Sequence, residues 1–418
     1  MVTVSKKPGF GEASPHAPHG NRKLKFKSTS SLALPVQANR MKDIPFSGIR
    51  KIFEECNRLE SEGKDIVHFE IGSPDFDTPN PIKESAKEAI DAGHVHYTSN
   101  YGIPELRSKL SHKFAVENNL SYDPEEEIIV TAGATEAVFI SILSLVDPND
   151  EVLIPDPCWT YEPAINAAEA TPVTYRLDPT NEFQPDEESL REAISENTKL
   201  LIVNTPHNPT GSILTDRSAE MIRDIAVEHD LYVISDEIYE KIIHAGAHVS
   251  IGSKPGMFER TVTINGFSKA YSMTGWRLGY LAAPQSLIDS IIRLRQYTST
   301  CASSISQHAG LRALEGDLHA PLADTYSERR SVLLERIEQI PGMTCPEPKG
   351  AFYAMPTLPD EVTDVEEFVW DLLREQGVAT VPGSVFGESA QDRIRFAYSI
   401  PKHRIEEGFD RIEAYFAE

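Results

Sequence analysis

The sequence has few cysteines, a deficit of positive charge and no long apolar segment. Four cysteines (Cys56, Cys158, Cys301 and Cys345) lie far apart, with no CxxC or Cys/His metal-ligand spacing, which predicts free thiols and no metal site. Lys and Arg number 40 against 64 Asp and Glu, a formal net charge of −24, and this argues against nucleic acid as a partner. The longest apolar candidate, residues 137–146, is far shorter than the roughly 20 residues that span a bilayer. These absences predict a soluble, cytoplasmic protein that binds neither nucleic acid nor membrane.

Residues 1–30 differ from the rest of the chain. They are basic, rich in Gly, Pro, Ser and His, and almost free of aliphatic side chains. A segment of this composition buries too little apolar surface to fold. We therefore expect residues 1–30 to be a disordered basic tail.

From residue 49 onward, short β-rich runs alternate with helical segments. The expected strands include residues 126–133, 150–157, 199–206, 230–237 and 260–266. Several of these runs are continuously apolar, which is typical of strands covered by helices on both faces. The alternation predicts an α/β fold with a doubly wound, mostly parallel sheet. Beyond about residue 310 the pattern changes to a long helix and scattered short strands, which predicts a smaller α+β domain.

Ligands of doubly wound sheets bind beyond the carboxyl ends of the strands, so the residues after each expected strand are the candidates for a site. These residues include Gly133, Ala134, Thr135, Trp159, Asn208, Asp236, Tyr239, Ser268 and Lys269.

Each candidate also has a structural interpretation. Lys269 is either a solvated surface charge or a nucleophilic amine in a desolvated pocket, and Arg277 eight residues later suits a phosphate dianion. Asp236 is either a helix cap or a buried carboxylate that keeps a ring nitrogen protonated. Trp159 is either a core residue or a stacking surface for a flat ring. Asn208, in "NTPHNPTG", either shapes a turn or presents its amide to a phenolic oxygen.

Taken together, the motifs carry a specific resemblance. The ordered set "YTSNYGIPELR", "TAGATEA", "CWTY", "NTPHNPTG", "SDEIY", "SKAYSMTGWRLGY", "GAFY" and "RIRFAYS" resembles the class I/II aminotransferases of pyridoxal-phosphate fold type I. The resemblance runs from about residue 40 to the C-terminus. It implies an N-terminal arm and helix over 31–74 that join the small domain, a large cofactor-binding domain over 75–310 and a small C-terminal domain over 311–418.

The resemblance also implies roles for the residues around a pyridoxal 5'-phosphate ring. Lys269 would bind the aldehyde covalently and then act as acid and base. Asp236 would pair with the ring nitrogen, and Asn208 and Tyr239 would hydrogen-bond the ring oxygen. Trp159 would stack on the ring. Of these residues, Lys269, Asp236 and Tyr239 would be catalytic, while Asn208 and Trp159 would also contact the substrate.

Further positions match the family's phosphate and substrate contacts. The residues expected around the phosphate are Ala134, Thr135, Ser268 and Arg277. Tyr97 resembles a tyrosine that reaches the phosphate of the neighbouring subunit, which implies a homodimer with shared active sites. Arg395, helped by the backbone of Gly72, would bind the substrate α-carboxylate. Arg393 is the rival for that role, and the choice of Arg395 follows from the family match.

The implied function is amino transfer between an L-amino acid and a 2-oxo acid such as 2-oxoglutarate, by a ping-pong mechanism. Some aspartate-preferring relatives carry a lysine where this chain has Thr135, so aspartate, aromatic and aliphatic amino acids all stay open as donors. Contacts to the substrate side chain are expected from residues 45–49. The alternatives are a C–S β-lyase or related synthase with the same cofactor, and a non-catalytic protein descended from the fold.

Overall fold

The computed structural model describes residues 37–159 and 161–417. The predicted basic tail over residues 1–30 lies outside this part of the chain. Within it, no helix is both long enough and apolar enough to cross a membrane.

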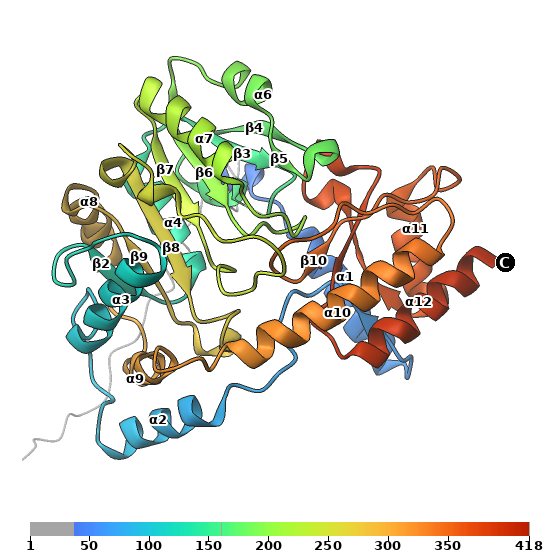
Figure 1. Ribbon diagram of the computed structural model, residues 1–418, viewed down its shortest axis with the longest axis horizontal. Coiled ribbons are helices and arrows are strands. Elements are labelled where there is room, and N and C mark those ends of the chain that lie inside the picture. Colours follow the sequence, from blue (N-terminus) through green and yellow to red (C-terminus); the bar gives the residue numbers. More distant parts are fainter. Residues whose placement is uncertain (1–36, 160, 418) are drawn as a thin grey trace, which may run out of the picture. The chain divides into compact units, whose positions relative to one another are not determined.

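A central sheet of eight strands organises most of the chain (Figure 1). Its strand order is β2-β9-β8-β7-β6-β3-β4-β5. The pairs from β8 through β7, β6 and β3 to β4 are parallel, whereas β9 runs antiparallel to both β8 and β2, and β5 runs antiparallel to β4. The strands are β2 (Ile128–Thr131), β3 (Glu151–Asp156), β4 (Thr171–Asp178), β5 (Gln184–Pro185), β6 (Thr198–Asn204), β7 (Tyr232–Asp236), β8 (Thr261–Gly266) and β9 (Gly279–Ala282).

Helices cover both faces of this sheet because its strands alternate two apolar sets. On β6, Leu200 and Ile202 pack with α4, α5 and α8, while Leu201 and Val203 point to the opposite face and pack with α6 and α7. Helices α2, α3 and α9 cover the β2–β9 end of that opposite face. The helices are α2 (Asn80–Asp91), α3 (Pro104–Glu117), α4 (Ala134–Leu145), α5 (Glu162–Ala167), α6 (Glu187–Glu192), α7 (Asp216–Glu228), α8 (Gln285–Arg295) and α9 (Ser304–Ala313). The predicted doubly wound, mostly parallel α/β sheet is therefore confirmed.

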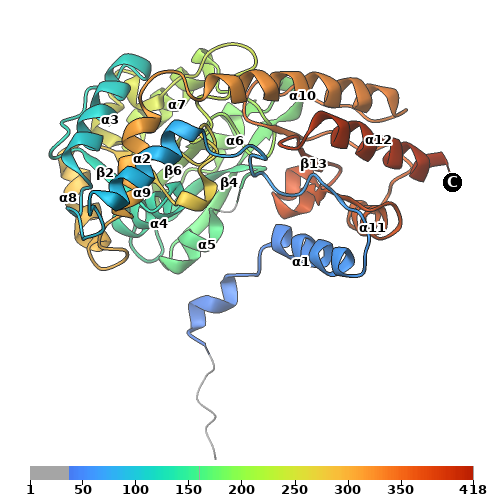
Figure 2. The same ribbon diagram turned by 90° about the horizontal axis from the view of Figure 1, so that it is seen from below.

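A further hydrophobic core joins the two ends of the described chain. Helix α1 (Gly48–Ser61) places Ile52, Cys56 and Leu59 in this core, together with residues of helices α10 to α12 and two small sheets. Strand β1 pairs in parallel with β11, and β13 lies between β10 and β12. Figure 2 shows α10 and α12 running alongside each other, with α11 nearer α1. These elements are α10 (Ala320–Gln339), α11 (Val365–Asp371), α12 (Lys402–Ala417), β1 (Val67–His68), β10 (Tyr353–Ala354), β11 (Val378–Ala379), β12 (Val381–Pro382) and β13 (Ile394–Ala397).

The sequence located most of these elements and missed one long strand. The run "TPVTYRLD" forms β4, whose side chains are in part exposed at the β5 edge of the sheet, so it lacks the apolar continuity of its neighbours. The domain boundaries after residues 74 and 310 stay a prediction.

Candidate active site

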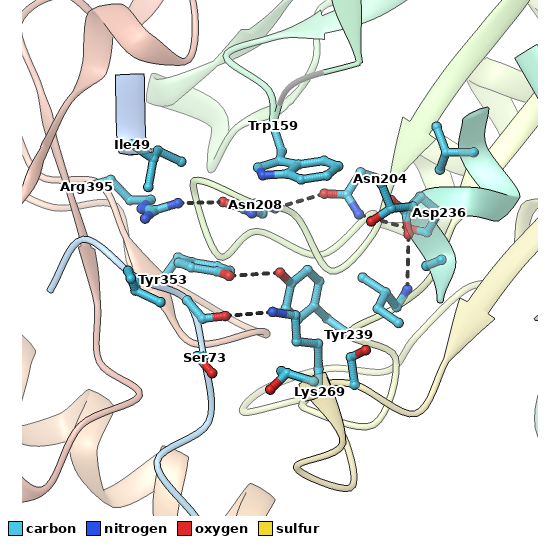
Figure 3. A pocket seen from close by; sticks show the side chains of 18 of the residues that line it. Ile49, Ser73, Trp159, Asn204, Asn208, Asp236, Tyr239, Lys269, Tyr353 and Arg395 are labelled. Atoms are coloured by element: carbon cyan, nitrogen blue, oxygen red, sulfur yellow. Dashed lines mark hydrogen bonds between the residues drawn. The ribbon is translucent and has the colours of Figure 1, made fainter. Parts of the chain in front are cut away.

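A cavity of about 610 Å³ lies beyond the carboxyl ends of the sheet strands (Figure 3). It faces β1, β10 and β13, so both the central sheet and the second core contribute to its wall. The predicted site residues that line the cavity are Gly72, Ala134, Thr135, Trp159, Asn208, Asp236, Tyr239, Ser268, Lys269, Arg277 and Arg395. The order of the strands thus brings together side chains that are more than 300 positions apart in sequence.

Lys269 follows β8 and extends its amine into the cavity. Its Nζ donates a hydrogen bond to the carbonyl of Gly72 at 2.6 Å. Burial, reinforced by the positive charges of Arg395 and Arg277, lowers the pKa of Lys269 to about 8. A substantial fraction of the amine is therefore neutral near pH 8, which is the form that attacks an aldehyde.

Asp236 closes β7 with its carboxylate buried in the cavity wall. The Tyr161 hydroxyl donates to one carboxylate oxygen at 2.9 Å, and the backbone N–H of Ile238 approaches the other at 3.4 Å. Burial raises the pKa of Asp236 to about 6, although the Tyr161 hydrogen bond opposes the shift. A carboxylate that burial disfavours is stabilised when a cation arrives beside it.

Arg277 and the start of α4 form an interlocked pair. Gly133 precedes α4 with a φ of 88°, and a Cβ atom there would lie 2.5 Å from a guanidinium nitrogen of Arg277. On the other side, a Cβ atom at Gly279 would lie 2.5 Å from the backbone nitrogen of Ala134. The two missing side chains let the guanidinium and the first N–H groups of a 12-residue helix face the same space, an arrangement that suits a phosphate.

Arg395 points into the opposite end of the cavity from Asp236 (Figure 3). Its guanidinium donates to the Asn208 side-chain oxygen at 3.3 Å and to the carbonyl of Glu70. It also lies 4.9 Å from the ring centroid of Tyr353. Its rival, Arg393, does not line the cavity, since its guanidinium donates to the Met355 carbonyl and lies over Phe183.

The structure adds side chains to which sequence reasoning gave no role. Tyr161 and Tyr353 belong to the motifs "CWTY" and "GAFY", but their partners lie in other motifs. The Tyr353 hydroxyl hydrogen-bonds the Tyr239 hydroxyl at 2.8 Å. Residues 45–49 were expected to contact the substrate side chain, and of these Ile49 lines the cavity. Arg50 and Phe53, which lie just beyond that segment, also line it.

Tyr97 is the one predicted site residue that the structure keeps apart from the cavity. Its side chain is 88% exposed.

The sequence matches a known protein family over most of its length. The family model for class I and II aminotransferases matches residues 64–412. The chain belongs to this family. This confirms the resemblance that the motifs carried, and the protein is accordingly a transaminase, which exchanges an amino group between an amino acid and a 2-oxo acid.

Individual relatives extend the match along nearly the whole aminotransferase chain. It is 41% identical to an aspartate aminotransferase of Pyrococcus abyssi over 92% of this chain and 99% of the relative. It is 39% identical to aromatic-amino-acid aminotransferase 2 of Thermococcus litoralis, over 91% and 98% of the two chains. Among solved structures, the aspartate aminotransferase of Thermus thermophilus with maleate superposes with a TM-score of 0.86 at 35% identity, over 91% of this chain and all of that one.

Proposed function

We propose that this aminotransferase binds pyridoxal 5'-phosphate in the cavity and uses it to move the amino group of an L-amino acid to a 2-oxo acid such as 2-oxoglutarate. The observation that carries the proposal is the pairing of Lys269 and Asp236 in one cavity wall. One is an amine whose pKa is lowered to about 8, and the other is a buried carboxylate whose pKa is raised to about 6.

The residues present fit each part of this cofactor. The Lys269 amine suits the aldehyde, and the buried Asp236 carboxylate suits a protonated ring nitrogen. The space left by Gly133 beside Arg277 suits the phosphate. Trp159 offers the face of an indole at the cavity wall (Figure 3). When bound, the cofactor withdraws electrons from the substrate α-carbon, which makes the α-proton transferable.

The protein's own residues then divide the remaining work. Lys269, once its amine is free, moves a proton at the substrate α-carbon, because a pKa near 8 allows it to act as base and then as acid close to neutral pH. Asp236 keeps the ring nitrogen protonated. The Tyr239 and Asn208 side chains, which are hydrogen-bonded to Tyr353 and Arg395 respectively, would hydrogen-bond the ring oxygen.

Arg395 binds the substrate α-carboxylate in this proposal. Its guanidinium is almost fully buried, at 2% exposure, and its Nε is buried without a hydrogen-bond partner among residues 37–159 and 161–417. A buried, incompletely paired guanidinium strongly favours an incoming carboxylate. The carbonyl of Gly72 accepts a hydrogen bond from Lys269, and the carbonyl of Glu70, two residues earlier, accepts one from Arg395, so one backbone segment contacts both groups.

The decisive experiment is a single turnover without an acceptor. The holoenzyme is mixed with one amino acid at a time, and the 2-oxo acid and ammonia are quantified per active site. An aminotransferase stops after one 2-oxo acid per site and releases no ammonia, because the amino group stays on the cofactor. Continued release of ammonia and pyruvate from a sulfur amino acid would instead support the β-lyase alternative.

We also infer a homodimer in which Tyr97 reaches the phosphate site of the neighbouring subunit. An exposed aromatic ring that does not line its own cavity supports this arrangement. Mixing Tyr97→Ala and Lys269→Ala subunits tests it, because each mixed dimer would regain one site with both native residues. If dissociation and reassociation of the two variants gives no activity above their separate values, the shared site is wrong. A cytoplasmic location stays a prediction.

A further inference from the structure

The cavity contains one cation to which the proposed function gives no role. The positively charged residues that line it are Arg50, Lys269, Arg277 and Arg395, and the negatively charged ones are Glu70 and Asp236. Lys269 and Asp236 serve the cofactor ring, Arg277 the phosphate and Arg395 the α-carboxylate. The remaining anion, Glu70, directs one carboxylate oxygen to His68 Nδ1 at 2.9 Å. Arg50 alone is left among these charges.

Helix α1 explains why Arg50 faces the cavity. Ile52, Cys56 and Leu59 anchor the helix in the core at intervals of four and three residues. At the N-terminal end of the helix, Ile49, Arg50 and Phe53 line the cavity, and Ile49 also packs against that core. In Figure 3, Ile49 lies towards Arg395, with Asp236 at the other side of the view. Arg50 is the next residue along α1 and lines the same cavity, so we assign it to the end of the cavity where the proposed function puts the substrate.

Arg50 is solvent-exposed, and the residues around it do not balance its charge. It lies in the first turn of α1, where the helix dipole disfavours a cation, and this turn contains no acidic residue. Across the described parts of the chain its guanidinium makes no hydrogen bond or ion pair, and its aromatic contact is Phe53, whose ring centroid is 5.7 Å away. An arginine without a counter-ion in a chain with a net charge of −24 is available to an anionic ligand.

Among the described residues that line the cavity, no other cation is left to bind a second carboxylate. Thr135 lines the cavity as a neutral residue, and Val138, Ile49 and Phe53 contribute apolar surface. A second carboxylate on the substrate would therefore find its positive partner in Arg50.

From this arrangement we propose that Arg50 binds the distal carboxylate of acidic substrates, so that the enzyme transfers amino groups between four- and five-carbon dicarboxylic amino acids and 2-oxo acids. The inference rests on the proposed function and adds its substrate class. The substrate is then held at two carboxylates by two arginines, Arg395 at the α-carboxylate and Arg50 at the distal one. The apolar residues beside Arg50 also leave room for a neutral side chain, which would lack the second ion pair.

The test compares L-aspartate with L-phenylalanine as donors in the half-reaction without an acceptor, since a dicarboxylic acceptor would itself depend on Arg50. The holoenzyme and its Arg50→Gln variant are followed by quenched flow, and the ratio of kcat/KM for aspartate to that for phenylalanine is recorded. We expect this ratio to fall by about 10- to 100-fold in Arg50→Gln, the effect of losing a charged hydrogen bond. Arg50→Lys should restore most of it. Lys51→Gln, an exposed neighbour that does not line the cavity, should leave the ratio within twofold of the parent value.

Each failure has a distinct meaning. An unchanged ratio, or equal losses for both donors, would overturn the role of Arg50. A parent enzyme that uses phenylalanine but neither aspartate nor glutamate would also overturn it, while leaving amino transfer intact. A parent enzyme that forms no 2-oxo acid from any donor would overturn the proposed function itself. Arg395→Lys provides the contrast, because loss of the α-carboxylate contact should raise KM for both donors.

Discussion

Asp236 and Glu237 are adjacent in sequence and both buried, yet they belong to very different regions. Successive side chains at the end of β7 point to opposite sides, so Asp236 enters the cavity and Glu237 enters a buried ionic cluster behind it. Asp236 accepts two hydrogen bonds, and it forms no ion pair with any residue that the structure describes. Glu237 accepts from Ser235, Ser250, Asn118 and His248.

The buried ionic cluster comprises Lys113, Asn118, Glu237, Glu240 and His248. The Lys113 ammonium forms an ion pair with Glu240 and donates to the Asn118 oxygen at 2.7 Å. Although burial alone would raise it, the pKa of Glu240 is held at about 2 by Lys113 and His248. In this cluster the charged side chains pair with one another. In the cavity, the charged side chains are available to pair with bound ligands. Substitutions should therefore affect stability in one region and activity in the other.

The largest effect is expected for Lys269→Ala. Removal of the amine eliminates both the covalent attachment and the proton transfer, so kcat should fall by at least about 10⁴-fold. The variant should still bind pyridoxal phosphate, but borohydride should no longer fix the cofactor to the protein, as mass spectrometry can measure. Lys254→Ala, at a surface ion pair with Asp216, is the control and should retain both properties. Borohydride fixation to Lys269→Ala would show that another lysine does the chemistry.

In the ionic cluster, Glu240→Gln should lower the free energy of unfolding by roughly 3 kcal/mol, because the buried Lys113 loses its shortest ion-pair partner and keeps, among the residues that the structure describes, only Glu117, at 3.5 Å. The pKa of Glu240 is about 2 when folded against an ordinary 4.5, so its contribution is complete above pH 4.5 and is lost as the pH falls towards 2. The difference between parent and variant in denaturant unfolding should accordingly narrow below pH 4.5. Glu84→Gln, which breaks an exposed pair with Lys87, should cost less than about 1 kcal/mol at every pH. A pH-independent loss for Glu240→Gln would contradict the assignment.

Asp236→Asn, in the cavity, should impair activity and leave stability nearly unchanged. It removes the charge that the proposed function assigns to the cofactor ring nitrogen, and it should lower kcat by roughly 100-fold or more. Its effect on the free energy of unfolding without cofactor should stay within about 1 kcal/mol of zero or be stabilising, because burial already disfavours the carboxylate and raises its pKa to about 6. Kinetics together with unfolding of the cofactor-free protein check both halves. If Asp236→Asn strongly destabilised the protein and left kcat normal, Asp236 would behave like a residue of the ionic cluster, and the proposed difference between the two regions would be wrong.

The smallest effect is expected for His248→Gln. Burial lowers the pKa of His248, but the Glu237 carboxylate outweighs burial and raises it above 6.5. The ion pair therefore stabilises the fold fully below pH 6.5, and its contribution is lost as the pH rises through the raised pKa. We expect a loss of about 1 kcal/mol at pH 6 that shrinks towards pH 9, with kcat within twofold of the parent. If the loss of unfolding free energy grew with pH, His248 would not be stabilising the fold through an ion pair with Glu237.

What the sequence predicted follows from the rule that parallel strands end at one edge of a sheet. Asp236 is the last residue of β7, and Asn208 and Lys269 follow β6 and β8 within four residues, so the local pattern was enough to predict that they meet. The partners of Asp236 and Tyr239 were not, because Tyr161 and Tyr353 reach them only through tertiary packing. Arg50 reads in the sequence as one more charge on an amphipathic helix. Only the position of α1 against the cavity distinguishes it from Lys51.

The close packing of Gly133 against Arg277, and of Gly279 against the start of α4, limits which substitutions this part of the site can accept. A larger residue at Gly133 would displace the guanidinium, and a shortened Arg277 would lack the group that the proposed function assigns to the phosphate. We therefore expect either substitution, made first, to weaken cofactor binding. Variation in substrate preference is left to positions outside this close packing, such as Ile49, Arg50 and Thr135, and libraries intended to redirect the enzyme are best confined to them.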